Sequence, residues 1–144
     1  MRSTEQFAGL DRSLQRAWIK GAGFTDEELA QPLVLMANSY QDFSPENSHL
    51  RQVVDAVKAG VRMAGGTPLE FNTFHVTDSE AFAARSMRYV LPSRDVVADS
   101  IELMAEGHGV DGLVLLTGGD KPTPGMVMAA ARLDLPSILL YAGS

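Results

Sequence analysis

GLVLLT at Gly112–Thr117, followed by GGDKPTPG at Gly118–Gly125, is the stretch that decides the fold class. Its first six residues are almost all apolar, which is typical of a parallel strand buried on both faces. The glycines and prolines that follow predict a loop. Thr123 and Pro124 suit the N-cap and first residue of a helix that runs to about Leu133. A buried strand, a loop and a helix in this order form the repeating unit of an α/β fold.

The same alternation continues on both sides of this stretch. Short apolar runs predict three more strands, at Leu33–Ala37, Leu69–Val76 and Ser137–Tyr141. Strands of this kind, separated by helical patterns, indicate a parallel sheet with helices on both faces. The chain is therefore predicted to be a single domain, residues 1–144, with a three-layer α/β/α fold and a mostly parallel sheet of about four strands.

The helices between these strands are marked by apolar spacing and by start and stop signals. One helix is predicted from about Leu50 to Val61, with Gly65–Gly66 as its stop. Ser93 is placed to cap a second long helix. Two short helical stretches come before the first strand, and Thr25 with Glu28 forms a capping box there.

Composition and charge exclude several classes of function. The net charge of −6 argues against a nucleic-acid interface and against docking on an anionic membrane. No apolar run approaches the roughly 20 residues of a transmembrane helix, and Met1–Leu10 is not a signal peptide, so a cytoplasmic location is expected. The sequence holds no cysteine, which excludes disulfides, zinc–thiolate sites, cysteine nucleophiles and conventional iron–sulfur ligation.

Chemistry in such a sheet is expected in the loops after the carboxyl ends of the strands. Gly119 lets a ligand approach the backbone closely, and Asp120 offers oxygen ligands suited to Mg²⁺. Lys121 is a candidate base, or a cation for a substrate carboxylate. The alternative is a tight turn with a capping aspartate and a solvated lysine. The loops in question are 38–47, 77–92 and 118–123.

Other polar side chains near these loops are candidates for either a functional or a structural role. Asp78 follows the second strand and is a candidate partner of Asp120 at a magnesium ion, or else an unrelated loop aspartate. His75, on the predicted strand, is expected to be structural, whereas His49 at a helix start is a candidate for the site. His108, near a helix C-terminus, is expected to complement the helix dipole.

The arginines of the second loop are candidates for carboxylate binding. Arg94, with Arg85 and Arg88, could hold a carboxylate through paired hydrogen bonds. Solvated surface arginines are the alternative reading for each of them.

A long collinear series of short motifs resembles the dihydroxy-acid and sugar-acid dehydratase family. The match runs in order from about residue 33 to 143. Its pieces are Asn38–Ser39, Pro45, His49–Leu50, Ala64–Gly66, Glu70–Thr73, Tyr89, Leu91–Arg94, Ala98–Glu102, Asp120–Lys121, Thr123–Met126, Met128–Ala129 and Arg132–Leu133.

The resemblance implies a set of site residues. In that family the positions of Asp78, Asp120 and Lys121 hold a magnesium ion, and the lysine is carbamylated. The family's iron–sulfur cluster acts on the leaving hydroxyl, and a serine of a later domain takes the proton. The positions expected to bind substrate are Asn38, Ser39, Ser93, Arg94, Gly119 and Thr123.

The departures from the family pattern are as informative as the match. Gly119 stands where the family has a cysteine, and Glu46 where many members have another. Ser79 replaces the glycine of the second loop. The sequence ends at Ser144, where the family continues for several hundred residues. Dehydration by the family's mechanism is therefore not expected of this chain alone.

The sequence thus predicts a repurposed, cluster-free, stand-alone homologue. It would catalyse a non-redox lyase, isomerase or cyclase step on an oxygenated small-molecule acid in a biosynthetic pathway, with Mg²⁺ as the candidate cofactor. The expected catalytic groups are Lys121, Glu46, His49 and Glu80. Alternatives are a subunit of a split dehydratase and a non-catalytic binding or scaffold protein. An unprotected sheet edge leads us to expect a homodimer or a partner subunit.

Overall fold

The computed structural model describes residues 1–143, and Ser144, the end of the predicted domain, lies outside them. Its four strands are β1 (Leu33–Asn38), β2 (Thr67–Asn72), β3 (Gly112–Thr117) and β4 (Ser137–Tyr141). They form one sheet in the order β2-β1-β3-β4, and every neighbouring pair is parallel. The predicted strand count and parallel sheet are confirmed.

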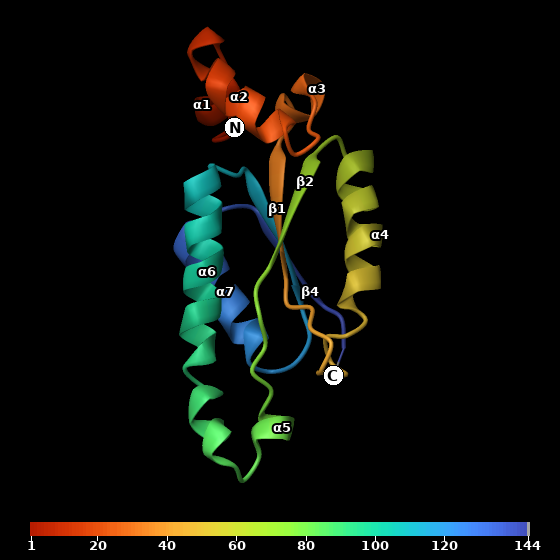
Figure 1. Cartoon of the computed structure of the whole chain (residues 1–144), viewed down its shortest axis with the longest axis vertical. Helices are drawn as coiled ribbons and strands as arrows, with labels where there is room; N and C mark the ends of the chain where they lie inside the picture. Colours follow the sequence, from red (N-terminus) through yellow and green to blue (C-terminus); the bar gives the residue numbers. More distant parts are fainter. Residues whose placement is uncertain (144) are drawn as a thin grey trace.

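Helices cover both faces of the sheet, which confirms the three-layer α/β/α fold (Figure 1). α4 (Leu50–Met63) lies on one face, and α6 (Ser93–His108) and α7 (Pro122–Leu133) pack together on the other. Alternate residues of each central strand point to opposite helical layers, as the pleat requires. Both central strands are therefore apolar up to their last residues, Asn38 and Thr117, as the sequence suggested.

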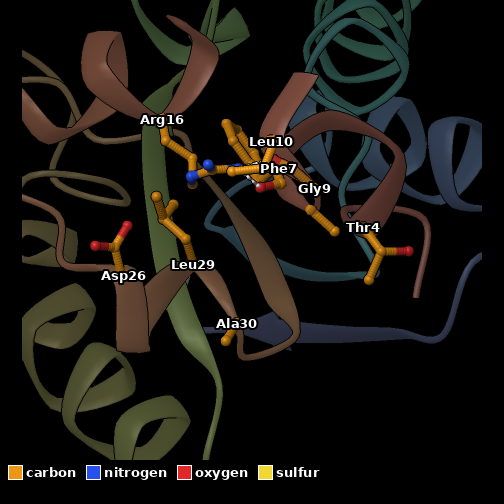
Figure 2. A pocket seen from close by; sticks show the side chains of 9 residues that line it. Thr4, Phe7, Gly9, Leu10, Arg16, Asp26, Leu29 and Ala30 are labelled. Atoms are coloured by element: carbon orange, nitrogen blue, oxygen red, sulfur yellow. Dashed lines mark hydrogen bonds between the residues drawn. The ribbon is translucent and has the colours of Figure 1, made fainter. Parts of the chain in front are cut away.

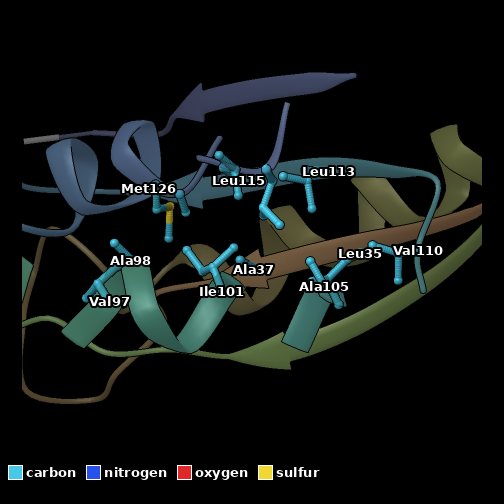
Figure 3. Close-up of a cluster of buried hydrophobic side chains, with 12 residues drawn as sticks. Leu35, Ala37, Val97, Ala98, Ile101, Ala105, Val110, Leu113, Leu115 and Met126 are labelled. Atoms are coloured by element: carbon cyan, nitrogen blue, oxygen red, sulfur yellow. The ribbon is translucent and has the colours of Figure 1, made fainter. Parts of the chain in front are cut away.

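The larger core lies between the sheet and the α6–α7 layer (Figure 3). Leu35 and Leu115 from the strands meet Ile101 of α6 and Met126 of α7 there. Ile101, Leu115 and Met126 are fully buried. Burying each such side chain contributes roughly 1.5–3 kcal/mol. This core fixes where the ends of the strands, and hence the functional loops, lie.

β2 begins and ends earlier than the predicted Leu69–Val76, so placing His75 on a strand was wrong. β2 is an edge strand that pairs only with β1, and the register ends where Asn38 meets Asn72. Thr73 N–H still donates to Asn38 O, at 2.8 Å, but β1 offers no further partner. The chain therefore leaves the sheet, and His75 lies in the loop beyond it.

The helix starts also differ slightly from the sequence expectation. α7 begins at Pro122, after Lys121 as N-cap, rather than at Pro124 after Thr123. Ser93 is the first residue of α6 rather than its cap, and its hydroxyl donates to Val90 O at 2.6 Å. Pro122 suits the first helical position, because a residue there needs no backbone N–H donor.

The N-terminal segment lies over the amino ends of the strands (Figure 1). It consists of α1 (Thr4–Phe7), a 3-10 helix η1 (Leu10–Arg12), α2 (Ser13–Lys20) and α3 (Asp26–Leu29). The predicted capping box of Thr25 and Glu28 is confirmed at α3. Asp111 ties this segment to the sheet, because its carboxylate accepts from Ser3 N–H and hydroxyl and from Leu33 N–H.

β4 is the second edge of the sheet and is exposed along its whole length. Ile138 is 66% exposed and Tyr141 48% exposed. An exposed apolar edge strand is a template for pairing with another polypeptide. Across the described part of the chain, no helix is long and apolar enough to cross a membrane.

Candidate functional site

The loops after β1, β2 and β3 come together at the carboxyl edge of the sheet. The loop after β2 leads into α5 (Asp78–Ala81) and a 3-10 helix η2 (Arg85–Tyr89). Gly118 follows β3, and a Cβ added there would lie only 2.1 Å from Glu46 O of the β1 loop. Glycine at this position lets the two loops touch, so residues far apart in sequence share one site.

Lys121 lies at the centre of this site. Its ammonium Nζ donates to Asp78 Oδ2 at 2.8 Å and to both carboxylate oxygens of Asp120 at 2.6 Å. The lysine is only 5% exposed. The structure thus brings together the three residues proposed to hold magnesium, here as an ion-paired triad.

The ion pairs of this triad favour the charged forms of Lys121 and Asp78. Burial acts to lower the pKa of Lys121, but hydrogen bonds and charges from Asp120 and Asp78 outweigh it and raise that pKa. The hydrogen bond from Lys121 in turn lowers the pKa of Asp78. Lys121 is therefore a cation at neutral pH and not a free base.

Glu46 and His75 fill the space beside Gly119. A Cβ on Gly119 would lie 2.5 Å from Glu46 Oε2, 2.5 Å from His75 Cε1 and 3.0 Å from His75 Nε2. Gly119 also has a φ of +80°, a conformation that favours glycine. The two positions where the resemblance puts cysteines, Glu46 and Gly119, thus face each other, and a carboxylate and an imidazole occupy the space between them.

The environment of Glu46 disfavours its charge. Burial, followed by the negative charges of Asp120 and Asp78, raises the pKa of Glu46. Burial lowers the pKa of His75, so its imidazole is neutral. A carboxyl group with a raised pKa and an uncharged imidazole therefore lie side by side at this edge of the sheet.

His75 is held by a buried hydrogen-bond network that the sequence did not reveal. Its Nδ1 lies 2.7 Å from Asn47 Oδ1, and the Asn47 amide donates to Ser39 Oγ at 2.8 Å and to Gly118 O at 3.3 Å. The side chain of Gln41 receives the His75 backbone N–H, at 3.3 Å. Asn47 and Gln41 lie in the polar loop after β1, but only the folded chain shows that they hold His75.

The other predicted catalytic residues lie at the margin of the site. His49 is the N-cap of α4, and its Nε2 contacts Ala142 O at the end of the β4 segment. Glu80 is exposed on α5 and lines a cavity beside His75. Neither side chain is hydrogen-bonded or ion-paired to the Lys121 triad.

Most of the predicted substrate-binding residues make internal contacts. Asn38 donates to Glu70 Oε1 at 3.0 Å, and Ser39 donates to Leu116 O at 3.2 Å. Arg94 donates to Asp120 O at 3.2 Å and so supports the loop. Two further predicted residues also have internal partners, Ser93 with Val90 O and Thr123 with Gly119 O. Gly119 is part of the loop after β3, and Arg94 contacts Asp120 of the same loop.

Two cavities lie at opposite ends of the molecule. A cavity of about 470 Å³ adjoins the site and is lined by Gln41, Phe43, Phe74, His75, Val76, Thr77, Glu80, Ala81 and Ser86. Another, of about 580 Å³, lies among the N-terminal helices, where Arg16 donates to Phe7 O and Gly9 O (Figure 2). Only the first borders the ionisable residues of the candidate site.

Fold and site together define a parallel α/β domain with an acidic, lysine-containing site at the carboxyl edge of its sheet. The model of the dihydroxy-acid/6-phosphogluconate dehydratase N-terminal family matches residues 31–144. The chain belongs to this family.

Curated relatives match almost the whole chain. The dihydroxy-acid dehydratase of Pyrococcus furiosus is 49% identical over 143 residues, which is 99% of this chain and 26% of that relative. That of Caldanaerobacter subterraneus is 50% identical, with the same two coverages. A Clostridium pasteurianum relative is 47% identical and is covered to 50%. This chain therefore spans about a quarter of the length of the first two relatives and half of the third.

The resemblance implies a magnesium ion and an iron–sulfur cluster, and the residues of the site fit only the magnesium ion. Asp78 and Asp120 converge on a single point, now held by the Lys121 ammonium, and a carbamylated lysine would add oxygen ligands there. Within residues 1–143 no three His, Cys, Asp or Glu side chains are arranged as a metal site, so the lysine would be needed. An iron–sulfur cluster does not fit, because Glu46 and His75 occupy the space beside Gly119.

Proposed function

We propose that this dehydratase-family chain performs a cluster-independent lyase or isomerase step on a small oxygenated carboxylic acid. The observation that carries the proposal is the buried Lys121 held between Asp78 and Asp120 at the carboxyl edge of the sheet. A buried cation with two carboxylates, beside an uncharged imidazole, is a typical arrangement for binding and polarising an oxygenated substrate.

The chain's own residues have separate roles in this proposal. Asp78 and Asp120 would hold Mg²⁺ together with Lys121 if its ammonium were replaced by a carbamate, and the bound ion would supply Lewis-acid polarisation of substrate oxygens. Glu46 holds or moves a proton at Oε2, since its pKa is raised by burial and by neighbouring carboxylates. Glu80 lines the adjoining cavity, and His49 lies at the margin.

Turnover of small 2,3-dihydroxy acids tests this proposal. The purified chain is incubated with each acid, Mg²⁺ and bicarbonate, and products are followed by proton NMR. We expect product formation that Lys121→Met and Glu46→Gln abolish, while Glu5→Gln, at an exposed position of α1, leaves it unchanged. Equal turnover in Lys121→Met, or neither turnover nor saturable binding of any acid, would overturn the proposal.

A second candidate function is that of one part of a two-part dehydratase. The exposed edge and apolar side chains of β4 favour it, because another polypeptide, or a second copy of this chain, would cover them. Ile138→Lys tests this role. It should abolish association and leave the fold unchanged, as measured by sedimentation and circular dichroism.

A further inference from the structure

The cavity that adjoins the candidate site has a largely apolar lining. Its volume is about 470 Å³, within the range typical of small-molecule sites. The apolar part of the lining comes from the loops after β1 and β2 and from α5, as Phe43, Phe74, Val76 and Ala81. Among the described residues that line it, only Glu80 carries a charge. The cavity therefore suits an uncharged, apolar group and not a carboxylate.

Two phenylalanines favour an aromatic occupant. Phe74 is partly buried and packs against the larger core, whereas Phe43 is 67% exposed. A ring placed in the cavity would remove apolar surface of Phe43 from water, which is favourable. Aromatic pairs also stabilise one another through edge-to-face or offset contacts, beyond the area that they bury. An aromatic group is therefore preferred here over a small aliphatic one.

Gln41 supplies a hydrogen-bond donor without a partner. Its side chain is 8% exposed and lines the same cavity. Oε1 accepts from the His75 backbone N–H at 3.3 Å, which fixes the orientation of the amide. The amide nitrogen Nε2 is buried and has no hydrogen-bond partner within residues 1–143. Buried polar atoms of this kind are few in native proteins, and an acceptor oxygen of a ligand would satisfy this one.

The cavity and the Lys121 triad share one short segment. Asp78 begins α5 and accepts from Lys121, while Thr77 and Ala81, on either side of it, line the cavity. A ligand whose charged end lies at the triad can therefore extend along α5 into the cavity.

We propose that this cavity binds an aromatic substituent of the substrate acid, and that Gln41 donates to the oxygen next to the ring. The carboxylate end stays at the triad, because the cavity offers it no cation. The inference rests on the proposed function and narrows its substrate class to 2,3-dihydroxy acids that carry an aryl group on the third carbon. Phe43 and Gln41 are then the residues that determine specificity.

Calorimetric titration with two acids tests the substrate class. 2,3-Dihydroxy-3-phenylpropanoate is compared with 2,3-dihydroxybutanoate, which has a methyl group in place of the ring. Both are titrated with Mg²⁺ present in the Glu46→Gln background, where no turnover is expected. We expect the phenyl acid to bind at least about 10-fold more tightly. Phe43→Ala, and Ser86→Trp at an exposed position of the lining, should remove most of this preference and leave the methyl acid unaffected.

Two further variants examine the donor and the specificity of the effect. Gln41→Glu keeps an oxygen for the His75 N–H and loses the donor, so it should weaken the phenyl acid by about 3- to 10-fold. Phe82→Ala is the matched control for Phe43→Ala. Phe82 is 77% exposed and is not part of the cavity lining, so this variant should bind both acids as its parent does.

Acetophenone separates failure of this inference from failure of the proposed function. It has a ring and an acceptor oxygen but no carboxylate, so saturation-transfer NMR should show equal binding to the wild type and to Lys121→Met, and none to Ser86→Trp. Equal affinity for the two acids, or a preference that survives both Phe43→Ala and Ser86→Trp, would overturn the inference and leave the proposed function standing. If acetophenone binds as expected and neither acid does, the aromatic site is supported and the proposed function is not.

Discussion

Replacing Gly119 by alanine tests the central geometric claim, that Glu46 and His75 fill the space beside this glycine. The new Cβ would lie 2.5 Å from Glu46 Oε2 and from His75 Cε1, closer than carbon and oxygen atoms can approach without movement. It would also be held at a φ of +80°. Two separate costs therefore add in Gly119→Ala.

The magnitude follows from these two costs. A left-handed conformation costs a non-glycine residue roughly 1–2 kcal/mol. Overpacking a filled site costs typically about 1–3 kcal/mol. The carboxylate of Glu46 is the flexible end of a side chain and can move, whereas the His75 ring is fixed by Asn47. We expect Gly119→Ala to lower the free energy of unfolding by about 2–5 kcal/mol.

Equilibrium urea unfolding followed by circular dichroism measures this loss. In a double-mutant cycle, Glu46→Ala should recover about 1 kcal/mol of it, because one of the two close contacts disappears. Gly60→Ala is the matched control. No atom lies within 4 Å of a Cβ there, and Gly60 is in the middle of α4. That variant should gain roughly 0.5–1 kcal/mol. A loss below about 0.5 kcal/mol in Gly119→Ala would refute the packing described here.

Three further predictions concern charge. The folded chain raises the pKa of Glu46, so ionisation of this carboxyl group weakens the fold as pH rises above its usual pKa of 4.5. Glu46→Gln should therefore raise the free energy of unfolding at pH 7 and leave it almost unchanged in acid, as measured by urea titrations at several pH values. Burial would raise the pKa of Asp111, but hydrogen bonds from Ser3 and Leu33 outweigh it and lower this pKa. The contribution of Asp111 to stability is therefore present above pH 3.8 and is lost as the pH falls further. Asp111→Ala should lower the free energy of unfolding by about 1–3 kcal/mol at neutral pH, as measured by thermal unfolding. In Lys121→Met the pKa of Asp78 should rise, measured by carbon NMR titration, and an unchanged value would contradict the ion pair.

Much of the fold could be predicted because its signals are local. A strand buried on both faces must be apolar throughout, so Gly112–Thr117 and Leu33–Ala37 stood out at once. The parallel arrangement then brings the strand ends to one edge. This rule alone placed Asp78 near Asp120, and the structure joins them through Lys121.

The sequence prediction placed His75 on a strand, and the reason for this error lies in a different part of the chain. The sequence after Asn72 still reads as a strand, and no residue there breaks the pattern. β2 ends because its single neighbour ends, at Asn38, which only the sheet order reveals. The orientation of the His75 ring depends in turn on the Asn47 amide, which is held by Ser39 of its own loop and by Gly118 of the loop after β3.

The site as a whole is short of positive charge, and this shortage bears on the proposed binding of Mg²⁺. Three carboxyl groups, those of Glu46, Asp78 and Asp120, share the site with the single ammonium of Lys121. Burial, and after it the charges of Asp120 and Asp78, raises the pKa of Glu46. Carbamylation of Lys121 would turn this ammonium into an anion, so it is stable only if a cation arrives with it. Binding of Mg²⁺ at the triad and carbamylation are therefore expected to occur together.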